Sequence, residues 1–300
     1  MSTRRPLWAV TVETTLEAED AIGEMLGELF GSPASSYFDF ESGTSRVCVY
    51  GQGTVDPKAR LKIKEGLGRI RDCRIEIGPA RISIARVRKE DWAESWKRHF
   101  KPIEFEDLLL VKPGWSKKKP RKNQAVVILD PGLSFGTGQH PTTAFCLSEI
   151  ARNSPRRISR KNGQGFLDIG TGSGILAISA AKLGYGPVRA LDFDADAVRA
   201  ARANAVRNGV TFRIVRGDAA QLPLNPKIRY HFICANLISS LLVQERERIT
   251  AQLDRAGILV LAGILKREFS EVRRTYEKMG LKMVSTKSEK EWQSGSFCFR

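Results

Sequence analysis

Three closely spaced glycines could hold a nucleotide-type cofactor in this chain. The short apolar segment 166–169 is followed by Gly170, Gly172 and Gly174 at two-residue spacing. Glycine lets the backbone turn tightly and lets a ligand approach closer than a side chain would permit. A dinucleotide-binding loop needs its third glycine one position later, where Ile175 stands, so the spacing argues against NAD. We predict a cofactor loop in which Gly170 and Gly172 lie against the ligand, and Asp168 supports the loop.

Acidic and amide side chains follow the next predicted strands. Asp192 ends the apolar segment 188–192, where a βαβ unit places a carboxylate on a ribose, and we expect it to accept both ribose hydroxyls. Asp194 instead resembles the N-cap of the following helix. Asp218 could meet an adenine amino group or belong to a plain turn. Asn236 ends a further apolar strand.

These residues should lie on one rim, because ligands of open α/β sheets bind beyond the carboxyl ends of the strands. The rule brings Gly170, Asp192, Asp218 and Asn236 together. It predicts a single cofactor site built from four strand ends.

A second glycine-rich loop, residues 131–143, runs into a helix predicted over 142–150. Such a loop, which contains Phe135 and Gly136, can fold over a ligand. Pro141 sits where a first-turn proline belongs, and either Thr142 or Thr143 could present a hydroxyl at the helix start. The alternative is a rigid connection with a capping threonine. We expect a structural role for the neighbouring His140.

The elements around these residues alternate between strands and helices and therefore indicate an α/β fold with a parallel sheet. The strands begin with segments near 108–115 and 125–130 and continue to a terminal pair near 282–286 and 294–299. A single helix is expected over 237–253. This region, residues 105–300, is predicted to be the catalytic domain.

The N-terminal residues 1–87 follow a different plan. Strand, helix, two strands, helix and a closing strand region at 74–77 and 81–87 give the order β-α-β-β-α-β, a ferredoxin-like α+β domain. Residues 88–104 are predicted to form a linker helix, because Trp92, Trp96 and Phe100 fall on one helical stripe. No catalytic constellation occurs before this linker, so we expect a recognition or spacing module.

Composition limits the protein class. The 300 residues carry a net charge of +16, and 42% are hydrophobic, enough to bury a core. The sequence shows neither an apolar run long enough to span a membrane nor a secretory signal, so we expect a soluble cytoplasmic protein. The five cysteines are scattered, without a CxxC pair, and predict no metal site.

The positive charge suggests attraction to polyanions, and RNA is the obvious candidate. Many of the basic residues cluster in two loops, at 117–122 and 152–161. No RNA-reading module is recognisable. We therefore expect electrostatic docking without base readout, or solvated loops with no partner.

Together these motifs resemble the PrmA family, bacterial methyltransferases that modify the eleventh protein of the large ribosomal subunit. The resemblance is specific from about residue 90 onward and is one of layout before that. It rests on Glu90-Asp-Trp92 with Trp96-Lys97, the loop 130–143, the segment 168–176, Asp192, Ala235-Asn236 and Gly263-Ile-Leu265.

The resemblance implies a Rossmann-like class I methyltransferase domain that binds S-adenosyl-L-methionine through Thr143, Gly170, Asp192 and Asn236. It also implies methyl transfer to lysine ε-amines or the N-terminal α-amine of the ribosomal protein, which the N-terminal domain recognises. We assign Asn236 a further role in positioning the amine, and we expect a monomer.

Two alternatives stay open at this point. A methyltransferase of the same fold could act on another protein lysine or, given the charge, on RNA. A protein that binds the cofactor and the ribosome without turnover belongs to a different class and would release no S-adenosylhomocysteine.

Overall fold

The structure is a computed structural model of the chain, and it describes residues 7–32, 34–39, 43–52, 54–73, 75–87, 101–130, 140–158 and 164–300. The chain divides into two compact units, Met1–His99 and Phe100–Arg300. Most of the predicted linker helix at 88–104 lies outside the described residues. Its last two residues, Ile103 and Glu104, belong to a strand, because they pair with Val111 and Leu110.

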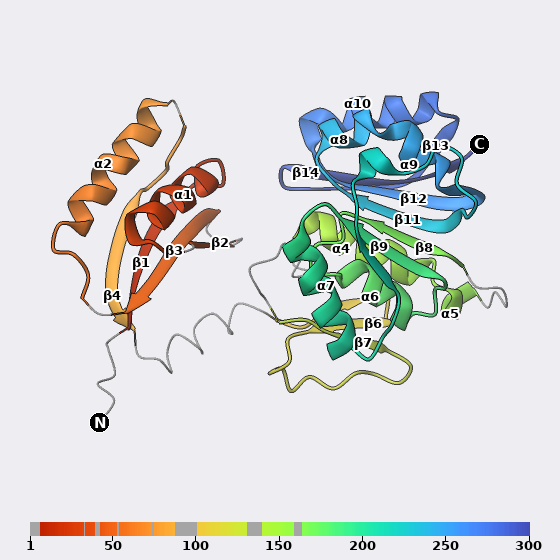
Figure 1. Cartoon of the computed structure of the whole chain (residues 1–300), viewed down its shortest axis with the longest axis horizontal. Coiled ribbons are helices and arrows are strands. Elements are labelled where there is room, and N and C mark those ends of the chain that lie inside the picture. The colour runs from red at the N-terminus through yellow and green to blue at the C-terminus, as the bar shows by residue number, and fades with distance from the viewer. Residues whose placement is uncertain are drawn as a thin grey trace. The chain divides into compact units, whose positions relative to one another are not determined.

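The first unit is a four-stranded antiparallel sheet with two helices (Figure 1). The strand order is β2-β3-β1-β4, which confirms the predicted ferredoxin-like plan. Its elements are β1 (Leu7–Thr14), α1 (Glu19–Phe30), β2 (Ser35–Asp39), β3 (Thr44–Gln52), α2 (Ala59–Asp72) and β4 (Arg81–Val87).

One predicted strand segment of this unit is wrong. Residues 75–77 form no strand, and β4 alone closes the sheet. Side chains hold the segment in place instead: the Thr14 hydroxyl donates to the Ile77 carbonyl at 3.1 Å, and Ile77 is buried in the core. The apolar Ile77 therefore contributes to core packing and does not mark a strand.

The second unit contains a seven-stranded sheet of order β10-β9-β8-β11-β12-β14-β13. Strands β10, β9, β8, β11 and β12 are parallel, and β14 runs antiparallel to both neighbours. The strands are β8 (Phe166–Ile169), β9 (Val188–Asp192), β10 (Arg213–Arg216), β11 (Tyr230–Asn236), β12 (Leu253–Leu265), β13 (Leu281–Glu289) and β14 (Trp292–Phe299). This is a Rossmann-like arrangement, as predicted.

Helices cover both faces of this sheet (Figure 1). The helices of this unit are α4 (Pro141–Arg152), α5 (Pro155–Ile158), α6 (Ile175–Lys182), α7 (Ala195–Arg207), α8 (Ser239–Gln244), α9 (Arg246–Ala251) and α10 (Lys266–Lys278). Alternate residues of β8 enter opposite cores: Phe166 packs in the cluster with α4, α6 and α7, whereas Leu167 and Ile169 pack in the cluster with α8, α9 and α10. This two-sided burial explains why the strand is a continuous apolar run.

A small three-stranded sheet adjoins the α4 and α6 side of the unit. It consists of β5 (Ile103–Phe105), β6 (Leu109–Lys112) and β7 (Ala125–Ile128). Strands β6 and β7 pair, as predicted, and they run parallel. Residues 113–124, which include the basic loop 117–122, form the crossover between them.

The helix predicted over 237–253 is divided. Glu245, which is buried, separates α8 from α9 with φ −96° and ψ 16°. No glycine or proline marks this break in the sequence. Within the described residues, no helix is both long enough and apolar enough to cross a membrane.

Candidate active site

The glycine loop joins β8 to α6. Gly170 has φ +75°, a left-handed conformation that favours glycine. A Cβ added to Gly170 would lie 2.5 Å from the Leu237 side chain, so any larger residue would have to displace that side chain as well as adopt the left-handed conformation. Helix α6 begins at Ile175, and its first backbone N–H groups face the loop side, as expected for an anion-binding or dipolar ligand site.

Asp168 anchors this loop from inside the protein. Its Oδ2 accepts from the Thr171 hydroxyl at 2.6 Å and from the Ala177 backbone N–H at 3.2 Å. The side chain is fully buried, and burial raises the pKa of Asp168 to about 7; the two hydrogen bonds oppose this shift, and the Asp192 charge adds to it. Its Oδ1 has no hydrogen-bond partner among the described residues.

Asp192 lies at the end of β9 with its carboxylate held by the loop. Oδ2 accepts from the Gly172 N–H at 2.8 Å, and Oδ1 accepts from the Asp194 N–H at 3.0 Å. An ionised carboxylate has about four lone-pair sites, so both oxygens can still accept ligand hydroxyls. Asp194 caps α7 by accepting from the Asp196 N–H at 2.9 Å, which confirms its separate structural role.

The strand register brings the predicted residues to one rim. Ile169 of β8 lies opposite Leu191 of β9 on one side and opposite Ala235 of β11 on the other. Gly170, Asp192 and Asn236 are the next residues of these three strands. Strands β8 and β11 are also where the strand order reverses, the place where open α/β sheets bind ligands.

Asp218 lies farther along this rim, after β10. The Gly217 N–H donates to the Asp192 carbonyl at 2.9 Å, which ties the two strand ends together. Asp218 Oδ1 accepts from the Ala220 N–H at 2.9 Å and caps a short 3-10 helix, Ala219–Gln221. The turn that the sequence left as an alternative is therefore present, and Oδ2 can still face a ligand.

Asn236 is the last residue of β11 and is half-buried. Its side chain makes no hydrogen bond with another described residue. Gly263 of β12 stands beside it: a Cβ there would lie 2.5 Å from the Leu237 carbonyl oxygen and 3.0 Å from Asn236 Oδ1. With φ +81°, Gly263 is the residue that lets this strand end keep its shape.

The start of α4 also reaches the rim. His140 precedes Pro141, the first residue of α4, and its ring packs edge-on against Trp292 with centroids 4.9 Å apart. Trp292 pairs with Leu265, at the same end of β12 that pairs with Asn236.

The two candidate threonines of α4 differ in their partners. Thr142 Oγ1 lies 2.7 Å from His140 Nδ1, whereas the buried Thr143 Oγ1 has no partner among the described residues. Burial lowers the pKa of His140, and the charges of Glu291 and Glu289 oppose this shift. The imidazole is therefore neutral near pH 7, and it is the hydrogen-bond partner of the Thr142 hydroxyl. Thr143 is therefore the threonine whose hydroxyl is available to a ligand. The other predicted residues of the loop, Phe135 and Gly136, lie outside the described residues.

These observations fit the predicted cofactor. Thr143 Oγ1 and Asp168 Oδ1 are buried polar atoms without a hydrogen-bond partner among the described residues, a costly state that a ligand or water would relieve. The missing side chain of Gly170 lets the glycine loop pack directly against Leu237, next to Asn236. Sequence reasoning did not give Gly263 a role of its own, although a glycine inside an apolar strand is a known signal for a close backbone approach.

Comparisons with known proteins agree with the geometry. The family model described as "Ribosomal protein L11 methyltransferase (PrmA)" matches residues 7–298. A relative from Caldicellulosiruptor bescii, named ribosomal protein L11 methyltransferase, is 32% identical over 303 residues, covering 95% of this chain and 96% of the relative. One of the same name from Geobacter metallireducens is 37% identical over 217 residues, covering 72% and 69%.

A solved structure points the same way. The ribosomal protein L11 methylase from Lactobacillus delbrueckii subsp. bulgaricus is 26% identical, with a TM-score of 0.57, and covers 67% of this chain and 100% of its own. The family match spans both compact units, and the relatives are matched over most of their length. The chain therefore belongs to the PrmA family of ribosomal protein L11 methyltransferases.

Proposed function

We propose that this protein transfers methyl groups from S-adenosyl-L-methionine to amino groups of ribosomal protein L11. The observation that carries the proposal is the family match over residues 7–298, which includes the cofactor rim and the N-terminal unit. It favours a protein substrate over RNA, and an enzyme over a cofactor-binding assembly protein.

The cofactor would be held by the residues of the rim. Gly170 and Gly172 would lie against it, Asp192 would accept its ribose hydroxyls, and Thr143 would use its hydroxyl, which no other described residue binds. Asp218 would serve the adenine end, with Phe135 and Gly136 over the ligand. When bound, S-adenosyl-L-methionine supplies an electrophilic methyl group on a sulfonium centre.

The protein's task is then to present a neutral amine in line with that methyl group and to exclude water. A lysine amine of pKa about 10.4 costs roughly 4 kcal/mol to deprotonate near pH 7.4, whereas an N-terminal amine of pKa about 7.8 costs about 0.5 kcal/mol. A lysine therefore depends on the site to favour its neutral form. Desolvation at the rim does so, because it penalises the charged form of an amine.

Asn236 would position the amine. Its side-chain oxygen makes no hydrogen bond to another described residue. It can accept from an amine N–H while the lone pair of the amine nitrogen faces the methyl group. Gly263, directly beside this oxygen, would keep the space for it.

The finer points are also proposals. The N-terminal unit would recognise the ribosomal protein, and the boundaries 1–87 and 105–300 would separate recognition from catalysis. The basic loop 117–122 would contact ribosomal RNA electrostatically. The protein would act as a cytoplasmic monomer.

The central test is methylation of purified L11 by the purified chain with labelled S-adenosyl-L-methionine, followed by intact-mass analysis. We expect added methyl masses on L11. Repeating the reaction in a lysate, with RNase or protease digestion afterwards, addresses the alternative. Label that disappears with RNase and survives protease would contradict a protein substrate.

A second test concerns Asn236. We expect Asn236→Ala to slow methyl transfer in single-turnover assays more than it weakens cofactor binding by calorimetry. The matched control is Asn153→Ala, which removes an amide that donates to the Glu149 carbonyl at the C-terminal end of α4, the end opposite to Thr143. Equal losses of transfer and binding in Asn236→Ala would count against a positioning role.

A further inference from the structure

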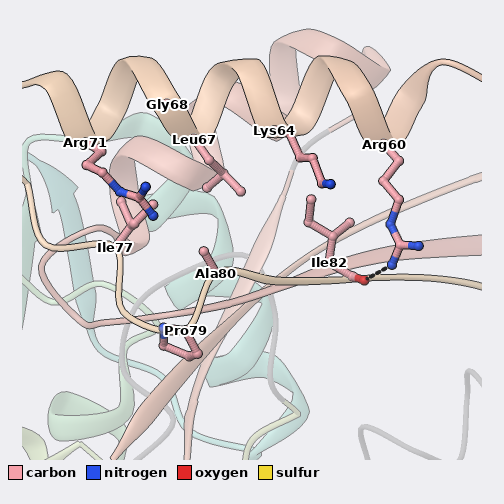
Figure 2. A pocket seen from close by; sticks show the side chains of 9 residues that line it. All are labelled: Arg60, Lys64, Leu67, Gly68, Arg71, Ile77, Pro79, Ala80 and Ile82. Carbon is pink, nitrogen blue, oxygen red and sulfur yellow. Dashed lines mark hydrogen bonds between the residues drawn. The ribbon is translucent and has the colours of Figure 1, made fainter.

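A basic groove lies in the N-terminal unit, between α2 and the segment that leads into β4 (Figure 2). Its volume is about 490 Å³. One wall carries Arg60, Lys64 and Arg71, all exposed and all from α2. Among the described residues, no acidic and no aromatic side chain lines the groove.

The cations form a row along one face of α2. Arg60, Lys64 and Arg71 are four and seven residues apart, which returns to the same side of a helix and spreads them over about 16 Å. Lys64 and Arg71 make no ion pair with any described residue. Lys62, by contrast, faces elsewhere and pairs with Asp56 at 2.8 Å.

The charge of this unit is segregated between its two helices. Helix α1 contains four acidic residues and no basic one, whereas α2 contains five basic and two acidic residues. A generally basic surface would not produce this separation. The α2 face is therefore a local attraction site for an anionic partner.

The floor of the groove is aliphatic. Leu67, Ile77, Pro79 and Ile82 line it beneath the cations (Figure 2). Single-stranded RNA is bound by stacking bases on aromatic rings, which are absent from this groove, and an RNA backbone alone would leave the aliphatic floor uncovered. A protein segment with both acidic and aliphatic side chains would use both surfaces.

We propose that this groove binds an extended acidic protein segment in which carboxylate and aliphatic side chains alternate. In an extended chain every second side chain points the same way, at a repeat of about 6.6 Å. The 6 Å axial step from Arg60 to Lys64 matches that repeat. Carboxylates would thus meet α2 while the intervening aliphatic side chains cover the floor.

Arg60 restricts how the segment is held. Its guanidinium donates to the Ile82 carbonyl at 2.7 Å, on the edge strand β4, which pairs only with β1 among the described strands. This covers an exposed acceptor of the sheet edge. Covering this acceptor favours binding of the segment through its side chains over its addition as a strand.

This proposal rests on the proposed function, because a protein substrate could contain such a segment. Its test, however, needs no methyl transfer. The probe is an eight-residue peptide that alternates glutamate and valine, acetylated and amidated so that it offers no amine. Binding to the full chain is measured by calorimetry without methyl donor. Failure of L11 methylation with intact peptide binding would count against the proposed function alone.

Two double variants, each of which removes two positive charges, test where the peptide binds. We expect Lys64→Gln with Arg71→Gln to weaken peptide binding roughly fivefold, the size expected for two exposed ion pairs. Lys58→Gln with Arg69→Gln, on other faces of the same region, should leave binding within twofold. Lys64→Arg with Arg71→Lys should retain it, which separates lost charge from lost folding.

The peptide also has controls. Replacing valine by serine should weaken binding, and replacing glutamate by lysine should abolish it. Equal loss in both glutamine variants would overturn the proposal in favour of general charge attraction. Tight binding of an RNA duplex that depends on Lys64 and Arg71, with no peptide binding, would assign the groove to RNA and overturn it as well.

Discussion

The buried carboxyl of Asp168 makes this protein's stability depend on pH in an unusual direction. Burial raises its pKa from 3.8 to about 7, so between these values the folded protein holds a proton that the unfolded chain has lost. The unfolding free energy must then fall as pH rises through this window. About three pKa units at 1.36 kcal/mol each amount to a loss of roughly 4 kcal/mol, complete just above pH 7.

Asp168→Asn removes the titrating group and keeps an oxygen for the two loop hydrogen bonds. We expect urea unfolding of the wild-type protein to lose about 3 kcal/mol more between pH 5 and pH 8 than the variant does. The measurement uses protein without cofactor, and it follows the tryptophan fluorescence, to which Trp115 and Trp292 of the second unit contribute.

A direct reading of the same quantity is the carboxyl carbon signal of Asp168 in NMR, which should titrate near pH 7. A midpoint below pH 5 would refute the reasoning, because it would mean that the loop hydrogen bonds outweigh burial. So would a variant whose stability falls with pH as steeply as the wild type.

Three further substitutions test the site and its support. Thr143→Val should stabilise the cofactor-free protein by about 1 kcal/mol, since it removes a buried hydroxyl that has no partner among the described residues, and weaken S-adenosyl-L-methionine binding in calorimetry; unchanged affinity would contradict its assignment. Gly263→Ala should cost about 2 kcal/mol and slow methyl transfer, because its Cβ would meet the strand end of Asn236; wild-type rates would show that the strand end adapts. Asn208→Ala should lower the unfolding free energy by about 3 kcal/mol, because its buried amide hydrogen-bonds to both the N–H and the carbonyl of Ile128. Cofactor affinity, measured in parallel as the control, should stay the same.

Much of the fold follows from local patterns. Helix α4 starts with Pro141, as predicted, and α6 is followed by Gly184 with φ +90°, because proline and glycine act through their own backbone angles. The division at Glu245 was missed for the complementary reason: no residue there restricts the backbone, and packing alone decides the break.

The sequence by itself determined the glycine loop, the acidic strand ends and the parallel order that gathers them, since these depend on residue type and period. The tertiary structure decided which threonine hydroxyl at the start of α4 is available to a ligand, because Thr142 pairs with His140 whereas Thr143 has no partner among the described residues. It also decided the pKa of Asp168 and the close approach of Gly263 to the rim. Each of these depends on neighbours distant in sequence, and no local pattern records how near such neighbours come.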